Sequence, residues 1–465
     1  MQLLIDGELV DGARAIDLVN PADGQVFAAA PCADAAQVER AVAAGQRAFA
    51  GWRALDFAER GARIAALADA LEGRAEDFAT LLTQEQGKPL AEARGEIEGA
   101  VAALRYHAGL RLEPVVLKDS ATERVVEQRH PLGVVAAIVP WNYPLLLLAL
   151  KLAPALIAGN VVIAKPAPTT PLTTLMLGAL AADIFPAGVV QMLGDAGDVG
   201  PMLTAHPGIA HVSFTGSTAT GRRVMAAAAD TVKRFTLELG GNDPAILLDD
   251  ADVAAVAPIL FDGAMGNAGQ VCLGVKRIYA PCALMPALGA ALVECAQRAV
   301  VGDGRAVGTT IGPVQNAAQY ARLVDLLAEA RAQGRVLHGG VAIEGDGYYI
   351  APTIVTDLPD EARLVQEEQF GPIIPLLAYD DEEELVRRVN DGPYGLGASV
   401  WTADAARGQA MAARIDSGLV WVNRLFDLPF DVPIGGAKQS GIGRHQGLAG
   451  VEEFTQRRIV NAALG

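Results

Sequence analysis

The sequence is poor in cysteine, histidine and positive charge. Four cysteines in 465 residues are too few for a disulfide framework, which excludes the disulfide-rich secreted class. The six histidines form no H-x-x-x-H or similar pair, so we expect no metal site. Lysine and arginine number 37 against 54 aspartates and glutamates, a formal net charge of −17. This balance argues against nucleic acid or an anionic membrane surface as the main partner.

Long hydrophobic runs and a leader-like start are also missing. The most apolar stretch, Leu145 to Gly159, is too short to span a bilayer and contains Lys151 and Pro154, so we interpret it as a buried helix. The N-terminal MQLLIDGELVDG has no basic region and no long apolar core, which argues against a signal peptide. These absences predict a cytoplasmic protein with no membrane partner. Hydrophobic residues at 51% and charged residues at 20% are typical of a globular protein, here of two or three domains.

The first half of the chain alternates between strand-like and helix-like segments. Residues 34–110 have helical periodicity, which begins at a capping box formed by Asp34 and Gln37. Alanine-rich helical stretches then separate four short aliphatic runs of the buried-strand type: Gly133–Val139, Val161–Lys165, Val189–Leu193 and Ala210–Phe214. This alternation predicts an α/β fold with a parallel sheet and helices on both of its faces.

A second α/β region covers residues 244–423. Its expected helices are Ala251–Gly266, Met285–Val300 and Asn316–Gln333. Two segments fit neither region. Leu112–Gln128 is rich in valine and charge, like a strand that leaves the body of a domain, and the tail Phe454–Ala463 is similar.

Three residues stand where catalysis in an α/β fold would use them. Cys272 lies in Gly-Gln-Val-Cys-Leu-Gly, where backbone can approach a substrate; a lone cysteine is otherwise most often a small buried hydrophobe. Glu238 ends an apolar strand-like run before two glycines, and a helix cap or a surface ion pair has equal weight. Asn142, in Pro-Trp-Asn-Tyr-Pro, can donate its amide to an oxyanion, against the alternative of a plain Asx-type turn.

The segment Phe214–Gly221 favours a phosphate-bearing cofactor. It joins an expected strand to an expected helix. Gly216 permits a tight turn, Ser217 can cap the helix, and the free amides there suit a pyrophosphate. The spacing is not the usual G-x-G-x-x-G, so the pattern alone is weak. The segment Gly441–Gly447 also has the wrong spacing and no preceding strand, and we reject it as the cofactor loop.

Two further positions can serve the same cofactor. Lys165, followed by a proline, can supply a cation to a ribose or phosphate, although a lone lysine is more often a surface residue. Within Glu367–Pro372, Glu368 offers a carboxylate for ribose hydroxyls and Phe370 a ring for a nicotinamide. The alternative there is an ordinary turn after an acidic helix end.

The order and spacing of these segments resemble one family, the aldehyde dehydrogenases, along the whole chain. The interval of 34 positions from Glu238 to Cys272 is also similar to the family's. Seven segments match: Pro140–Pro144, Lys165–Pro166, Phe214–Gly221, Glu238–Asn242, Gly269–Cys272, Glu367–Pro372 and Gly435–Gly441.

The resemblance implies three parts. They are a Rossmann-type cofactor domain (residues 1–111 and 132–238), an α/β catalytic domain (239–450) and a β arm (112–131 with 451–465). In the family this arm pairs subunits, so a homodimer or homotetramer is expected.

The resemblance also implies the chemistry. Cys272 would attack the aldehyde, the Asn142 amide and the Cys272 N–H would hold the oxyanion, and hydride would leave to the nicotinamide. Glu238 would activate the water that hydrolyses the thioester. The implied cofactor contacts are Pro140, Trp141, Lys165, Gly216, Ser217, Gly221, Leu239, Gly240, Glu368 and Phe370.

Two positions depart from the family's usual pattern. Pro168 stands where relatives often have a glutamate that favours NAD, so we expect NAD, with NADP also possible. Ile434 stands where a phenylalanine is usual. The substrate pocket implied by the matching motifs is lined by Tyr143, Leu147, Leu150, Val271, Leu273, Leu428 and Ile434. Its largely aliphatic wall favours an apolar or aromatic aldehyde.

Three alternatives remain open. Arg424 could anchor the carboxylate of a semialdehyde, although a surface arginine beside Asp427 or Asp431 is favoured. A CoA-acylating enzyme is disfavoured by Glu238, which such relatives generally lack. A structural protein that has lost catalysis on the same fold is disfavoured by the joint presence of Cys272 with Glu238 and the oxyanion asparagine.

Overall fold

Short runs of valine, isoleucine and alanine form the centre of a first sheet, which is buried on both faces. The structure is a computed structural model that describes residues 1–464. Five adjacent central strands are parallel, and the strands toward both edges pair antiparallel with their neighbours. In spatial order the strands are β2 (Glu8–Val10), β1 (Leu3–Ile5), β9 (Val190–Met192), β8 (Val161–Lys165), β7 (Val134–Ile138), β10 (His211–Thr215), β11 (Arg234–Glu238) and β21 (Gly441–Ile442).

Eight helices cover this sheet in two layers. Mutual contacts group α1 with α7 and α8 in one layer, and α2 to α6 in the other. The helices are α1 (Ala35–Ala54), α2 (Phe57–Glu72), α3 (Ala75–Gln86), α4 (Leu90–Ala108), α5 (Pro144–Ile157), α6 (Leu172–Ala182), α7 (Val199–Ala205) and α8 (Thr218–Ala229). The predicted capping box at Asp34 and Gln37 is confirmed at the start of α1, as is the helix predicted from Leu145.

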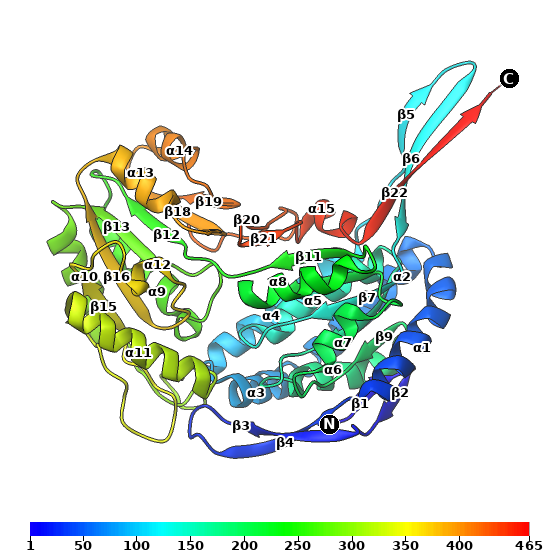
Figure 1. Cartoon of the computed structure of the whole chain (residues 1–465), viewed down its shortest axis with the longest axis horizontal. Coiled ribbons are helices and arrows are strands. Elements are labelled where there is room, and N and C mark those ends of the chain that lie inside the picture. The colour runs from blue at the N-terminus through cyan, green and yellow to red at the C-terminus, as the bar shows by residue number, and fades with distance from the viewer. Residues whose placement is uncertain (465) are drawn as a thin grey trace.

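A second sheet lies beside the first sheet and its helices, which together form the first body of the structure (Figure 1). All its neighbouring strands are parallel except the pair β14 and β15. Its order is β14 (Arg335–His338), β15 (Thr353–Thr356), β16 (Ile373–Tyr379), β13 (Arg277–Pro281), β12 (Pro244–Leu247), β18 (Gly397–Trp401) and β19 (Leu419–Val422). The helices of this region are α9 (Val253–Met265), the 3₁₀ turn η1 (Gly266–Gly269), α10 (Met285–Arg298), α11 (Ala317–Gln333), α12 (Arg363–Gln366), α13 (Glu382–Asn390) and α14 (Ala405–Ala412). The three predicted helices are confirmed with small shifts at their ends.

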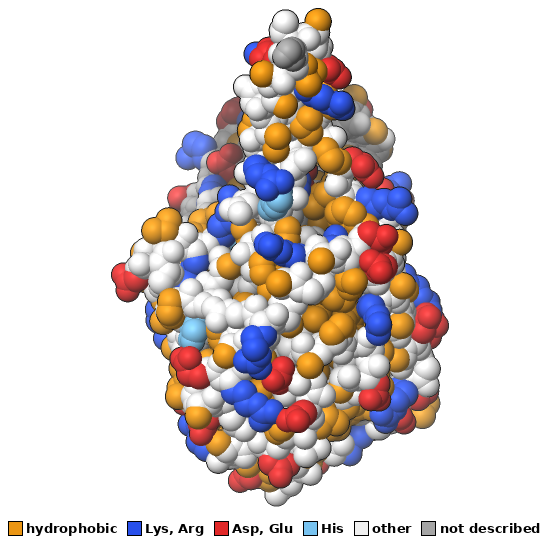
Figure 2. Space-filling view, turned by 90° about the vertical axis from the view of Figure 1, so that its right-hand side faces the viewer, with side chains coloured by type: hydrophobic (Ala, Val, Ile, Leu, Met, Phe, Trp, Pro, Cys, Tyr) orange, Lys and Arg blue, Asp and Glu red, His pale blue; other side chains and the backbone are white. Residues whose placement is uncertain are grey.

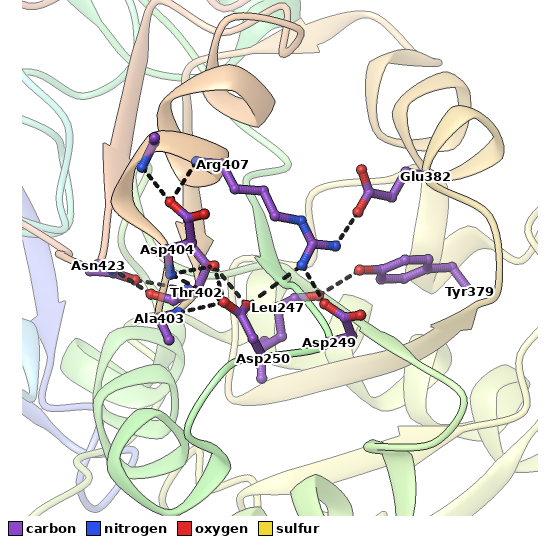
Figure 3. A network of polar contacts seen from close by, with 11 residues as sticks. Leu247, Asp249, Asp250, Tyr379, Glu382, Thr402, Ala403, Asp404, Arg407 and Asn423 are labelled. Carbon is purple, nitrogen blue, oxygen red and sulfur yellow. Dashed lines mark hydrogen bonds and ion pairs between the residues drawn. The ribbon is translucent and has the colours of Figure 1, made fainter.

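A network of polar contacts holds the ends of β12 and β18 against α13 and α14 (Figure 3). Arg407 of α14 pairs with Asp249 and with Glu382. Asp250 accepts a hydrogen bond from Thr402 Oγ1 at 2.7 Å. Charged groups therefore fix the carboxyl ends of these two strands of the second sheet.

An arm of three strands projects from the first body (Figure 1). It consists of β5 (Val115–Asp119), β6 (Glu123–Pro131) and β22 (Thr455–Ala463), with β6 in the middle. The tail strand is confirmed, but the single strand expected over residues 112–128 is wrong. The chain turns back at Ser120, whose N–H donates to the carbonyl of Glu123 at 2.9 Å, so this segment forms a hairpin.

The fully parallel first sheet expected from the sequence is wrong at its edges. Strands β1 and β2 form a hairpin about Asp6 and Gly7, which have φ of 56° and 79°. Asp-Gly is a known two-residue hairpin turn, so the sequence did contain this signal. The remaining short elements are the hairpin of β3 (Arg14–Val19) and β4 (Val26–Cys32), the pair β17 (Tyr394–Gly395) and β20 (Ala437–Lys438), and α15 (Gly447–Glu452).

No helix among residues 1–464 is both long and apolar enough to cross a membrane. Within the same residues, no group of three or more His, Cys, Asp or Glu side chains is arranged to hold a metal ion.

Helices α2 and α4 approach each other closely at a glycine. A Cβ added at Gly61 would lie 2.2 Å from the carbonyl oxygen of Ala108. We predict that Gly61→Ala lowers the free energy of unfolding by about 1–3 kcal/mol, because the backbones must separate. The control is Gly95→Ala in α4, where an added Cβ meets nothing within 4 Å. Gly95→Ala should raise stability by about 0.5–1 kcal/mol in the same denaturant titration. Equal effects of the two changes would contradict this packing.

Candidate active site

The parallel strands of the first sheet end at one edge, and the predicted catalytic residues gather there. Glu238 is the last residue of β11 and pairs in register with Thr215, the last residue of β10. Asn142 follows β7 in the turn before α5. Crevices at the carboxyl ends of parallel strands are the usual binding places of open α/β sheets.

Cys272 reaches this edge from the second region through a strained loop. Asn267 and Ala268 in η1 have φ of 50° and 54°, a left-handed backbone conformation that residues other than glycine rarely adopt. Gly269 has φ of 72°, and a Cβ there would lie 2.2 Å from the carbonyl oxygen of Gly371. The loop therefore packs backbone against backbone. The N–H of Cys272 has no hydrogen-bond acceptor among the described residues, so it is free to donate.

A buried ion pair positions Asn142. Lys88 Nζ lies 2.6 Å from Glu96 Oε2, and both side chains are fully buried. Lys88 Nζ also donates to the carbonyl of Asn142 at 2.8 Å, which in addition accepts from Asn267 Nδ2 at 3.0 Å. Glu96 Oε1 accepts from the first free N–H groups of α5. The Asn142 amide donates to the carbonyl of Gln270 at 2.9 Å, which orients it beside the Cys272 loop.

Two cavities meet at this point. The larger has a volume of about 400 Å³ and the smaller about 230 Å³. Both are lined by Asn142, Thr215 and Cys272. The thiol and the asparagine amide thus lie on the boundary between two spaces.

The larger cavity brings together eight of the ten predicted cofactor residues: Pro140, Trp141, Gly216, Ser217, Leu239, Gly240, Glu368 and Phe370. Lys165 and Gly221 do not line it. The ammonium of Lys165 is held 2.8 Å from Asp195 Oδ2. Gly221 faces Leu239, whose Cδ2 would lie 2.6 Å from an added Cβ, so the glycine permits close packing of α8.

Donors and rings in the larger cavity match the parts of a dinucleotide. Ser217 caps α8 by accepting from Thr220 N, as predicted. The N–H groups of Thr218 and Ala219 have no acceptor among the described residues, so this helix end can hold phosphate. Trp141 and Phe370 stand edge to face with ring centroids 5.3 Å apart. Gln319, Arg322 and Tyr394 also line the wall; they follow no motif and were missed.

The smaller cavity is lined by all seven residues predicted for the substrate pocket: Tyr143, Leu147, Leu150, Val271, Leu273, Leu428 and Ile434. Glu238 lines it as well. Sequence reasoning missed Leu146, Thr215, Leu396, Leu419, Phe426, Gly435, His445 and Gln446. Thr215 and Gly435 stand inside the matched segments Phe214–Gly221 and Gly435–Gly441, and His445 and Gln446 belong to the rejected Gly441–Gly447 segment.

Arg424 lies outside both cavities. It pairs with Asp427, and 70% of its side-chain surface is exposed. This geometry agrees with the favoured interpretation of Arg424 as a surface residue.

Burial raises the pKa values of Cys272 and Glu238. Burial, followed by the charges of Glu368 and Glu238, raises the pKa of the Cys272 thiol to about 12. Burial also raises the pKa of Glu238, opposed by the charge of Lys151. Glu238 Oε1 has no hydrogen-bond partner in the described part of the chain. The thiol is therefore protonated at neutral pH, and a carboxylate that can exchange a proton lines the same cavity.

The chain is similar to known proteins along almost its whole length. The model of the "Aldehyde dehydrogenase family" matches residues 9–460. An aldehyde dehydrogenase of Bacillus cereus, solved with NAD+, is 33% identical over 100% of this chain and 97% of its own, with a TM-score of 0.97. Betaine aldehyde dehydrogenase of Staphylococcus aureus, also solved with NAD+, is 32% identical over 100% and 94%, with a TM-score of 0.96. PnpE of Pseudomonas sp. WBC-3 is 36% identical over 100% and 97%, with a TM-score of 0.96.

The buried pair of Lys88 and Glu96 should matter far more than a surface pair. We predict that Glu96→Ala lowers the free energy of unfolding by about 3–5 kcal/mol, because it leaves a buried ammonium unpaired. The control is Glu76→Ala, which breaks an exposed pair with Arg94 and should cost about 0–1 kcal/mol. Both are measured by urea titration. A Glu96→Ala protein as stable as Glu76→Ala would show that Lys88 finds another partner.

Proposed function

Because this chain belongs to the aldehyde dehydrogenase family, we propose that it oxidises an apolar or aromatic aldehyde to the carboxylic acid, with NAD as the hydride acceptor and a thioester on Cys272. The observation that carries the proposal is the meeting of the two cavities at Cys272 and Asn142. An aldehyde in the smaller cavity and a nicotinamide in the larger one would both reach the thiol.

The first half of the reaction forms the thioester. Cys272 must lose its proton before it attacks, and Glu238, which lines the same cavity, accepts that proton and releases it to solvent before the hydrolysis begins. The sulfur then bonds to the aldehyde carbon. The Asn142 amide and the free N–H of Cys272 hold the resulting oxyanion. When the carbonyl re-forms, the hydrogen departs from the carbon as a hydride with the electron pair of its bond. The product that remains on Cys272 is a thioester.

The second half releases the acid. Glu238 takes a proton from water, and the hydroxide adds to the thioester carbon. The carbon–sulfur bond breaks, and the thiolate is regenerated. A carboxylate with a raised pKa suits both tasks, because it can accept and return a proton near neutral pH.

The larger cavity fits NAD, whose nicotinamide supplies the hydride acceptor. The N–H groups at the start of α8 suit its pyrophosphate, Glu368 its ribose hydroxyls, and the Trp141–Phe370 corner its ring. Lys165 would have to share its ammonium between Asp195 and the cofactor. Pro168 neither accepts hydrogen bonds from a free ribose nor repels a 2′-phosphate, so NADP is tolerated.

The three parts of the structure take separate roles in the proposal. The first body (1–111 and 132–238) holds the cofactor, and the second (239–450) supplies the nucleophile. The arm (112–131 and 451–465) joins subunits into a dimer or tetramer. Its support is the exposure of large apolar side chains along the arm: Val115, Val116, Leu117, Ile459 and Val460.

The nucleophile is tested by Cys272→Ala. We expect NADH formation from aldehyde to vanish, because no other thiol among residues 1–464 lines either cavity, while NAD+ binding by calorimetry changes little. The control is Cys282→Ala at an exposed cysteine, which should retain full activity. Near-normal turnover by Cys272→Ala would rule out the covalent route.

The base is tested by its pH dependence. Glu238 acts deprotonated, so the rate should rise with pH, and its raised pKa moves that rise above the range of an exposed carboxylate. Glu238→Gln should remove this limb of the kcat profile and slow turnover by about 10²–10⁴. The matched variant Glu76→Gln, on the surface, should keep the wild-type profile. A limb that survives in Glu238→Gln belongs to another group.

Substrate choice is tested by ranking aldehydes by kcat/KM. Each buried methylene contributes about 0.8 kcal/mol, so hexanal should exceed butanal by roughly tenfold. Benzaldehyde and hexanal should also exceed succinic semialdehyde, whose second carboxylate would meet an apolar wall and Glu238. Arg424→Ala should leave this ranking unchanged. Preference for the semialdehyde, lost in Arg424→Ala, would contradict the apolar pocket and support the semialdehyde alternative.

A further inference from the structure

A third cavity lies where the arm meets the first body, and it is larger than either site cavity. Its volume is about 610 Å³. It is bounded by the end of α1, the start of α2, and strands β6 and β22 of the arm. Five of its thirteen lining residues are basic: Arg53, Arg60, Arg129, His130 and Arg458. Figure 2 shows basic side chains and a histidine close together at the base of the arm.

Two of the four arginines already bind acceptor groups of the protein itself. Arg129 pairs with Glu452 at 3.0 Å and with Glu127 at 3.5 Å. Arg60 is buried, lies over the ring of Phe57, and donates to two backbone carbonyl oxygens at 3.0 and 2.5 Å. These two guanidinium groups build the wall of the cavity.

The other two arginines, Arg53 and Arg458, have no carboxylate partner among residues 1–464. Arg53 lies 5.3 Å from the centroid of the Phe49 ring. Arg458 donates to the side-chain oxygen of Gln128 at 2.6 Å. The wall contains one carboxylate, Asp56, and it is occupied as the N-cap of α2. Arg53 and Arg458 therefore face the same space without an ion-pair partner, and Asp56 is the one negative charge in the wall.

The imidazole of His130 lies within the field of both charges. Burial, then Arg458, then Arg53 lower its pKa. The ring is therefore neutral at pH 7 and can donate or accept one hydrogen bond. The overall charge of −17 does not cancel this local field, because exposed charges beyond about 8 Å are screened at physiological salt.

We propose that this arm-base cavity binds a small dianion, a phosphate or a dicarboxylate, between Arg53 and Arg458. Guanidinium groups form paired hydrogen bonds with such groups. Arg53 belongs to the body and Arg458 to the arm. A bound dianion therefore ties the arm to the body at a place separate from the two site cavities.

The test is calorimetric titration of the full chain with inorganic phosphate and, in parallel, with succinate at constant ionic strength. Saturating NAD+ is present, so that the free amides of α8 are not available to the probe. Binding should be saturable and should raise the thermal midpoint with ligand concentration by mass action. Arg53→Gln and Arg458→Gln should each weaken it at least about tenfold, or 1.4 kcal/mol. The control is Arg47→Gln, on α1 and paired with Asp6, which should bind as wild type.

Each outcome of the titration either supports or overturns the proposed dianion site. Binding of phosphate or of succinate that is lost in both variants supports the site and identifies the source of the dianion. Absence of saturable binding, or binding that persists in both variants, overturns it. If the carboxylates of a second copy filled the cavity, the substitutions would change the oligomeric state and neither probe would bind, which also overturns the proposal. Thermal midpoints measured without a probe show whether each variant is folded.

Discussion

The buried pair of Lys88 and Glu96 is the interaction on which the site depends most. Removing two charges from water costs free energy, and that cost is offset only because each group forms further hydrogen bonds besides the ion pair. Glu96 caps the start of α5, and Lys88 holds the carbonyl of Asn142 and lies 3.7 Å from the centroid of the Tyr143 ring. One pair thereby fixes the start of α5, the position of Asn142 and one wall of the smaller cavity.

A second constraint brings Cys272 to this turn. The left-handed residues at Asn267 and Ala268 are tolerated because the loop is over-determined by neighbouring groups. Lys276 donates to the carbonyl of Gly269 at 2.9 Å, and Gln270 Nε2 donates to that of Asn267 at 2.8 Å. The strain is therefore held in place by buried hydrogen bonds, and the turn after it leaves the N–H of Cys272 free.

The central strands and the positions of the site segments could be predicted from the sequence, because local patterns of residues encode both. The strand Val161–Lys165 was placed residue for residue. Contacts made by distant residues were not predictable in this way. Asp195 holds Lys165 from 30 positions away, and nothing in either local pattern indicates that pairing. Phe426 and His445 reach the smaller cavity from segments without a recognised motif, so its wall is less purely aliphatic than expected.

The most direct test of the central claim is intact mass spectrometry of Glu238→Gln after mixing with NAD+ and hexanal. If the two cavities meet at Cys272 as proposed, hydride transfer precedes the hydrolysis of the thioester, which is the step that Glu238→Gln blocks. The thiol proton of this variant then passes to water, which slows the formation of the thioester without preventing it. The protein should then gain the mass of one acyl group on Cys272, with one equivalent of NADH formed per subunit in a single burst. Cys272→Ala should show neither. A burst of NADH without an adduct, or an adduct on another residue, would contradict the account.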